Sequence, residues 1–249
     1  MTFEPDSALV GGIHASPNVE PRRPGFAPDM LLLHYTGLAT AAAAIDVLSR
    51  PDCKVSCHYV IDLDGHVVQM VPEALRAWHA GVAVWDGVTD INSCSVGIEI
   101  QNGGHAAGCP AFPELQMRAV EGLCQDICRR LRIRPERVLA HSDVAPQRKS
   151  DPGEWFDWRR LHAAGVGHWV APAPVDDKDF GLGPGEAGGG VGEAQVMLAD
   201  YGYGVALDGV LDQSTEAVVR AFQRHFRQAR VDGVADRSTI ETLHRLLAA

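Results

Sequence analysis

Two histidines of this chain end apolar runs, and they are the first candidates for chemistry. His34 ends the run MLLLH and His141 ends the run RVLAH, so each is expected at the end of a buried strand. Asp151 follows in the segment HSDVAPQRKSDPG, where Pro152 excludes a helix. Zinc accepts imidazole and carboxylate ligands at roughly 2.0–2.2 Å. We therefore predict that His34, His141 and Asp151 converge on one zinc ion.

Hydrolysis at such a centre also needs a base and a partner for the oxyanion. Three protein ligands leave a fourth position for water, whose pKa zinc lowers to about 7. The apolar residues of the strand-like run SVGIEI share one face, and Glu99 lies on the other. Partial burial would raise the pKa of Glu99 and suit it to general-base work. Lys149 precedes Asp151 by two residues, and in an extended loop its ammonium would project to the same side and stabilise an oxyanion.

Each of these residues also has an ordinary structural interpretation. A histidine at a strand end is often a surface residue, a lone glutamate in a strand often faces solvent, and Lys149 beside Arg148 can belong to a solvated loop. Spacing alone therefore leaves both a zinc hydrolase and a purely structural interpretation open. The motifs HExxH, GxSxG, GxGxxG and the P-loop are absent from the sequence, so a helix-based metalloprotease, a serine hydrolase and a phosphate-binding loop lack support.

The other histidines, out of 11 in the chain, carry weaker signals. His79, in AWHAG, is expected either to line a cleft or to pack, and His58, inside a predicted strand, is expected to be structural. Seven more show no partner pattern and are expected to be ordinary polar residues: His14, His66, His105, His162, His168, His225 and His244.

The elements that must position these groups alternate between strand and helix. MLLLHYT, SVGIEIQN and RVLAH are predicted as strands, and LATAAAAIDVLSR as a helix. Two strand runs flank Asp64-Gly65, a pair typical of a hairpin turn. Residues 114–132 have the apolar period of an amphipathic helix. The pattern predicts an α/β fold with a mixed sheet.

One change in composition divides the chain. Residues 171–192 are rich in Gly and Pro and are predicted as a linker with a flexible Gly-rich end. It separates a larger unit, 1–170, from a smaller one, 193–249, which contains a repeat: LDGVLDQSTEAVVRAF and VDGVADRSTIETLHRL. Each copy has an Asp-Gly turn, then N-cap residues, then a helix with apolar positions. A third helix from about Glu193 to Tyr201 completes a small bundle.

Composition narrows the class of protein. The chain has 249 residues, of which 46% are hydrophobic, so it can build a substantial core. Its formal net charge of −10 argues against nucleic acid as a partner. No apolar run approaches the length of a transmembrane segment. Six cysteines are too few for a disulfide scaffold; Cys53 and Cys57 bracket a turn and can pair if oxidised, whereas Cys124 and Cys128 are expected to be buried thiols.

Five segments make the larger unit recognisable. They are LLLHYTG, VSCHYVIDLDG, AWHAG, NSCSVGIEIQN and HSDVAPQRKSDPG, within about residues 30–153. The unit resembles the zinc-dependent N-acetylmuramoyl-L-alanine amidases of the amidase-2 type. The resemblance implies a central mixed sheet flanked by helices. It also implies hydrolysis of the amide that joins N-acetylmuramic acid, or its 1,6-anhydro form, to L-alanine of the stem peptide, in cell-wall recycling or remodelling.

The resemblance also assigns roles to single residues. His34, His141 and Asp151 match the family's zinc ligands, Glu99 matches its catalytic acid and base, and Lys149 matches the group that stabilises the transition state. Positions that match or adjoin the substrate groove are Tyr35, His79 and Asn92. A non-catalytic muropeptide receptor of the same fold is the alternative, which the complete ligand set disfavours; an antibacterial effector would share the chemistry.

The smaller unit resembles the peptidoglycan-binding type 1 module, a three-helix domain. The matching residues are LDGVLDQSTEAVVRAFQ and VDGVADRSTIETL, whereas HFRQAR between them departs from the usual short turn. The alternative is a helical appendage that stabilises the larger unit.

The start MTFEPDSALVGG has no apolar core of an export signal, which favours the cytoplasm; a wall-binding module favours the periplasm or cell envelope instead.

Overall fold

A six-stranded sheet forms the centre of the larger unit. The structure is a computed structural model, and it describes residues 3–249. The strand order is β1-β5-β4-β7-β3-β8, and the bounds are Gly12–Ile13 (β1), Met30–Tyr35 (β3), Tyr59–Ile61 (β4), Val67–Gln69 (β5), Ser95–Ile100 (β7) and Val138–Ala140 (β8). Because β3 pairs in parallel with β7 and β8 while β4 pairs with β5 antiparallel, the sheet is mixed, as predicted.

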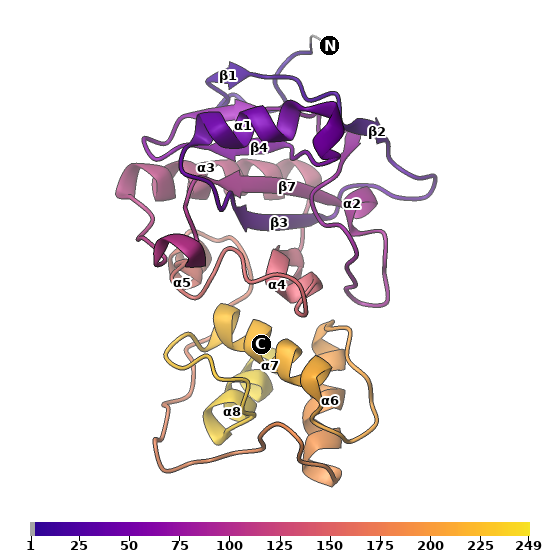
Figure 1. Cartoon of the computed structure of the whole chain (residues 1–249), viewed down its shortest axis with the longest axis vertical. Coiled ribbons are helices and arrows are strands. Elements are labelled where there is room, and N and C mark those ends of the chain that lie inside the picture. The colour runs from indigo at the N-terminus through magenta and orange to yellow at the C-terminus, as the bar shows by residue number, and fades with distance from the viewer. Residues whose placement is uncertain (1–2) are drawn as a thin grey trace.

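Helices cover both faces of this sheet (Figure 1). The amphipathic helix α3 (Glu114–Leu131) packs on the face formed by Leu31, Leu33 and alternate residues of β7. Helix α1 (Ala41–Ser49) packs on the opposite face, against Val60 of β4. Successive strand residues point to opposite faces, so His34 and Glu99, which are register partners in β3 and β7, lie side by side on the face away from α3.

Shorter elements complete the larger unit. The predicted hairpin joins β4 and β5, with Gly65 at a positive φ of 86° in its turn. A second, two-stranded sheet pairs β2 with β6 antiparallel. The bounds of the remaining elements are Val19–Pro21 (β2), Leu75–Ala77 (β6), Ile91–Cys94 (α2), His141–Val144 (α4) and Trp158–Ala163 (α5), with 3-10 turns at Pro51–Cys53, His105–Ala107 and Pro135–Arg137.

Three helices form the C-terminal domain: α6 (Gly189–Tyr201), α7 (Gln213–Phe226) and α8 (Arg237–Leu247). The side chains of Asp212 and Asp236 accept hydrogen bonds from the first turns of α7 and α8, so both repeats begin with the expected N-cap. In the second repeat Leu243 and Leu246 are buried, whereas Leu247 is 40% exposed.

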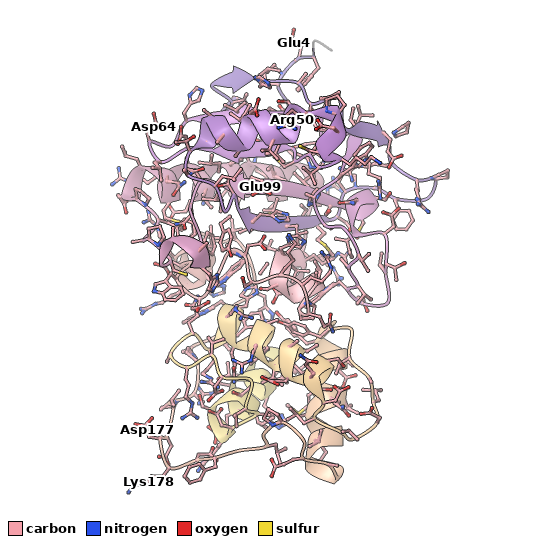
Figure 2. All side chains as sticks on the ribbon, viewed as in Figure 1. Glu4, Arg50, Asp64, Glu99, Asp177 and Lys178 are labelled. Carbon is pink, nitrogen blue, oxygen red and sulfur yellow. The ribbon has the colours of Figure 1, made fainter. Side chains whose placement is uncertain are left out.

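The predicted linker is more ordered than its composition suggested. Its last residues, 189–192, form the first turn of α6 instead of a flexible chain. Ala173 is buried and its amide donates to Thr242 of α8, and Leu182 pairs with Ala235. Asp177 and Lys178 project from the outer edge of this domain (Figure 2). The segment therefore runs along the C-terminal domain and is bound to it at several points.

The two parts of the chain share one hydrophobic core. Buried Leu32, Trp85 and Val144 of the larger unit belong to the same cluster as Tyr203 and Phe222 of the C-terminal domain. Helix α7 lies directly against α4 (Figure 1).

All six cysteines are free, so the pairing of Cys53 with Cys57 that the sequence allowed is not formed. Within residues 3–249, no helix combines the length and the apolar character needed to cross a membrane.

Candidate active site

Strand register brings the two candidate histidine ligands together. Leu33 of β3 is the register partner of Ala140 of β8. His34 and His141 are the next residues, so parallel pairing places them side by side at the carboxyl ends of their strands. His141 is also the first residue of α4. The amide of Ser142 donates to the Asp151 carbonyl at 3.0 Å, which holds the later loop against the same helix.

Three donor atoms meet at this point, and they form a nearly regular triangle. The distances are 2.9 Å between the Nδ1 atoms of His34 and His141, and 3.0 Å from each of them to Oδ2 of Asp151. Tetrahedral zinc with bonds of about 2.0–2.1 Å needs ligand atoms about 3.3 Å apart. All three side chains are buried. Small outward adjustments would make this triad fit a zinc ion.

The outer ring nitrogens of both histidines are already occupied, which sets their tautomers. Nε2 of His141 lies 3.0 Å from the Ala80 carbonyl and must donate to it, so Nδ1 is the ring nitrogen directed into the site. Nε2 of His34 lies 3.1 Å from Nδ1 of His79. Nε2 of His79 lies 3.3 Å from the hydroxyl of Ser95, which donates to a backbone carbonyl. The chain of hydrogen bonds therefore ends with a free Nδ1 on His34 as well.

Burial and charge favour the protonation states that a metal ion requires. Burial, reinforced by the neighbouring His141, lowers the pKa of His34 to about 4, so its ring is neutral at pH 7. Burial alone would raise the pKa of Asp151, but the charges and hydrogen bonds of His141 and His34 outweigh it and lower that pKa. Metal ligands must be deprotonated to bind, and these groups are.

Glu99 faces the same cavity from the neighbouring strand. Its side chain is half-buried, and its Oε2 is buried with no hydrogen-bond partner among the residues described. Burial raises the pKa of this carboxyl well above its usual value; the negative charge of Asp151 adds to the effect and the Lys149 ammonium opposes it. Figure 2 labels Glu99 on β7, in the middle of the central sheet. An unpaired carboxyl of raised pKa is suited to taking up and releasing a proton.

A cavity of 410 Å³ contains all five predicted metal and catalytic residues. Lys149 follows a turn, with its amide bonded to the Ala145 carbonyl at 3.0 Å, and is not in the extended loop expected from the sequence. Its side chain nevertheless lines the cavity with Asp151. A second pocket of 340 Å³ shares six lining residues with the first, so the two form one groove: Val55, Trp78, His79, His141, Arg148 and Lys149.

The three residues predicted to bind substrate have different surroundings. Tyr35 lines the cavity, and its hydroxyl lies 3.0 Å from Nδ1 of His105 and 3.2 Å from Oγ of Ser150. His79 lines the groove and also contacts His34, so cleft lining and packing, the two alternatives, both apply to it. Asn92 accepts hydrogen bonds from the amides of residues 79 and 80, and therefore fixes the backbone that carries His79.

Several important residues carried no recognised signal in the sequence. Gly97 leaves room for the His79 ring, since a Cβ at Gly97 would lie 2.5 Å from it. An isolated glycine in a strand pattern indicates such a close approach. Three histidines expected to be ordinary polar residues have side-chain partners: His105 contacts Tyr35, His168 contacts Tyr201 and His225 contacts Asp143. His58 is structural, as expected: it is buried, and its ring accepts a hydrogen bond from the Gly97 amide.

A mixed sheet with two histidines at its strand ends, a loop carboxylate beside them and an unpaired glutamate on the neighbouring strand is the arrangement of a metal-dependent hydrolase. The model of one family, described as N-acetylmuramoyl-L-alanine amidase, matches residues 24–154. A second model, described as a putative peptidoglycan binding domain, matches residues 187–243. The chain belongs to the N-acetylmuramoyl-L-alanine amidase family, which confirms the resemblance seen in its sequence motifs.

Individual relatives extend the likeness across both domains. The N-acetylmuramoyl-L-alanine amidase AmiD of Escherichia coli (strain K12) is 36% identical over 232 residues, covering 88% of this chain and 82% of AmiD. A solved complex of that enzyme with anhydro-N-acetylmuramic acid-L-Ala-D-gamma-Glu-L-Lys has a TM-score of 0.74 and 34% identity, covering 91% of each chain. The structure of AmpDh3 from Pseudomonas aeruginosa has a TM-score of 0.75 and 29% identity, covering 94% of this chain and 97% of AmpDh3.

Proposed function

We propose that this protein is a zinc-dependent N-acetylmuramoyl-L-alanine amidase. Its substrate would be a muropeptide or peptidoglycan strand, cut at the amide between the lactyl group of N-acetylmuramic acid, or the 1,6-anhydro sugar, and L-alanine. The observation that carries the proposal is the buried triad of His34, His141 and Asp151 with Glu99 facing the same cavity. Family membership and the substrate held by AmiD in its solved complex support it.

Zinc is the ion that the donor set favours. Two imidazole nitrogens and one carboxylate oxygen match its preferences, whereas magnesium and calcium prefer oxygen ligands. His34, His141 and Asp151, which all line the cavity, would hold the ion. When bound, zinc supplies Lewis-acid chemistry, polarising the scissile carbonyl and making water a better nucleophile.

The chain's own residues then move the protons. The Glu99 carboxylate accepts a proton from the attacking water, whose oxygen forms the new bond to the carbonyl carbon. As the carbon–nitrogen bond breaks, Glu99 returns that proton to the leaving amine, so that water is divided between the two products. The Lys149 ammonium faces the cavity and stabilises the negative charge that develops on the carbonyl oxygen. The groove beyond the triad accommodates the rest of the substrate.

Product analysis tests this function directly. The zinc-loaded full-length protein is incubated with soluble anhydro-muropeptides and with intact sacculi, and the products are identified by mass spectrometry. We expect free stem peptide beginning with L-alanine, and no release after the metal has been removed by chelation. Glu99→Ala should retain zinc but lose cleavage, while Glu4→Ala, an exposed glutamate far from the site (Figure 2), should behave as the native protein.

Three outcomes would contradict the proposal. They are full cleavage by a metal-free preparation, cleavage at another bond, and near-native turnover by Glu99→Ala with its zinc content verified. Binding of muropeptide without any cleavage by the zinc-loaded native protein would support the non-catalytic receptor instead.

A further inference from the structure

The short helix α4 connects the active site to the C-terminal domain through one carboxylate. Asp143 lies two residues after His141 and is completely buried. Its Oδ2 accepts a hydrogen bond from the amide of Ala140 at 2.8 Å. The other two partners come from the C-terminal domain: Nδ1 of His225 donates to Oδ2 at 2.7 Å, and the hydroxyl of Tyr203 donates to Oδ1 at 2.7 Å.

A buried carboxylate with these partners constrains the helix that carries it. A buried charge without hydrogen-bond partners is strongly unfavourable, so Asp143 requires the donors of the C-terminal domain to remain in place. The helix α4 has only four residues, so a shift at Asp143 is passed directly to His141. The position of one metal ligand therefore depends on side chains of the other domain.

The side chains of His225 and Tyr203 are themselves held in place by aromatic contacts. The ring of His225 stacks on Trp158 of the larger unit, with centroids 3.7 Å apart, and on Phe226, at 3.8 Å. The ring of Tyr203 packs edge-on against Trp85, with centroids 4.8 Å apart. These aromatic contacts restrict the positions that the two donors can occupy.

A second set of contacts reaches the loop that follows Asp151. Arg224, the residue before His225 on α7, has its Nε 3.6 Å from Oε2 of Glu154. Gln228 donates from Nε2 to the carbonyl of Phe156 at 2.8 Å. The segment from Asp151 to Phe156 is thus fixed at its far end by α7 and the residues just after it.

We propose that the C-terminal domain is a structural part of the metal centre. Asp143, His225 and Tyr203 are positioning residues that keep His141 in its ligand geometry. The inference rests on the proposed metal-dependent function, and it goes beyond wall binding as the role of this domain. It predicts that changes inside the C-terminal domain, far from any substrate, weaken metal binding.

The test separates the donor from the packing at residue 225. His225→Phe keeps an aromatic ring against Trp158 but removes the donor, whereas His225→Asn places an amide nitrogen where Nδ1 was. Tyr203→Phe removes only a hydroxyl and covers the case in which His225→Phe does not fold. His244→Phe, at an exposed position on α8, is the matched control. All variants are made in the full-length chain and checked by circular dichroism.

Zinc affinity, measured by competition with a chromophoric chelator, is the principal readout. The visible spectrum of the cobalt-substituted protein reports ligand geometry, and turnover of a soluble muropeptide is measured last. We expect His225→Phe to bind zinc about 10- to 100-fold more weakly, the range found when groups that orient metal ligands are removed. Tyr203→Phe should change in the same direction, His225→Asn should recover part of the loss, and His244→Phe should match the native protein.

Native zinc affinity and cobalt spectrum in folded His225→Phe and Tyr203→Phe would overturn the inference and leave the interface with a purely stabilising role. Failure of the proposed function has a different signature, because the native protein itself would then bind no zinc or cleave no muropeptide. A structural role alone would lower the unfolding temperature without changing the spectrum of the folded cobalt protein.

Discussion

Replacing Gly97 with alanine tests how the site orients its first histidine. A Cβ at this position would lie 2.5 Å from Cγ and Nδ1 of His79. Favourable contacts between carbon atoms are about 3.5–4.0 Å, so the ring must retreat by about 1 Å. Its backbone cannot follow freely, because Asn92 binds the amides of residues 79 and 80. The His79 ring must therefore move, which disturbs its contacts with His34 and Ser95.

The consequence is a weaker hold on His34. The distance from Nε2 of His34 to Nδ1 of His79 is 3.1 Å, and a retreat of about 1 Å takes it to about 4 Å, beyond hydrogen-bond range. We expect zinc affinity to fall about 10- to 100-fold, as for other groups that orient metal-ligating histidines. Overpacking of this kind also costs about 1–3 kcal/mol in the free energy of unfolding.

Chelator competition and chemical denaturation of the Gly97→Ala protein measure both effects. Gly122→Ala is the control: this glycine lies within α3, where a new Cβ would meet Leu9 at an ordinary 3.5 Å, and alanine should stabilise the helix by up to about 1 kcal/mol. In a His79→Ala background the clash is absent, so Gly97→Ala should add little to the loss already present. Native zinc affinity in Gly97→Ala, or an undiminished effect in that background, would refute the reasoning.

Three further predictions concern Glu99 and Lys149, the groups that act on protons and charge. Burial raises the pKa of Glu99 in the metal-free protein, so its carboxyl should titrate above the usual glutamate range when metal-free protein is titrated and followed by NMR; an unshifted titration would contradict this. Because the folded protein holds the proton of Glu99 more tightly than the unfolded chain does, the native protein loses stability as pH rises through the folded pKa of this carboxyl. Metal-free Glu99→Gln, which cannot ionise, should therefore unfold at a higher temperature than the native protein at pH 8 but not at pH 4. The zinc-loaded variant should lose activity. Lys149→Met should lower kcat by about 100- to 1000-fold with little change in zinc affinity, and a change confined to KM would assign Lys149 to binding instead.

Much of the site follows from rules that act along a single strand. His34 and His141 end apolar runs, and parallel pairing of those strands is enough to bring them together. Glu99 interrupts an apolar strand on the face opposite its core residues, and its register partner is His34. Alternation acts within a single strand, so the sequence alone placed His34, His141 and Glu99 on their strands, whereas their meeting depends on pairing between distant strands and was expected from the family resemblance.

What could not be predicted depends on contacts between distant segments. The role of His79 requires the loop that carries it to place its ring against Gly97 of β7. The role of His225 requires α7 to dock on α4, and nothing in the spacing of Asp143 and His225, 82 residues apart, indicates that pairing. The Gly-rich end of the expected linker begins a helix because tertiary packing of Val191 outweighs the poor helix propensity of glycine.

The shared core also explains how the site can hold groups that destabilise it. Glu99 leaves a buried oxygen unpaired, and Asp151 and Asp143 are two further buried carboxyl groups. The unpaired oxygen of Glu99 costs free energy, and the apolar cluster that spans both domains contributes to offsetting that cost. Docking of the C-terminal domain therefore stabilises the region of the active site, where the unpaired carboxyl lowers stability. Substitutions that weaken the contact between the two domains should disturb the metal site before they disturb the distant hairpin at Asp64.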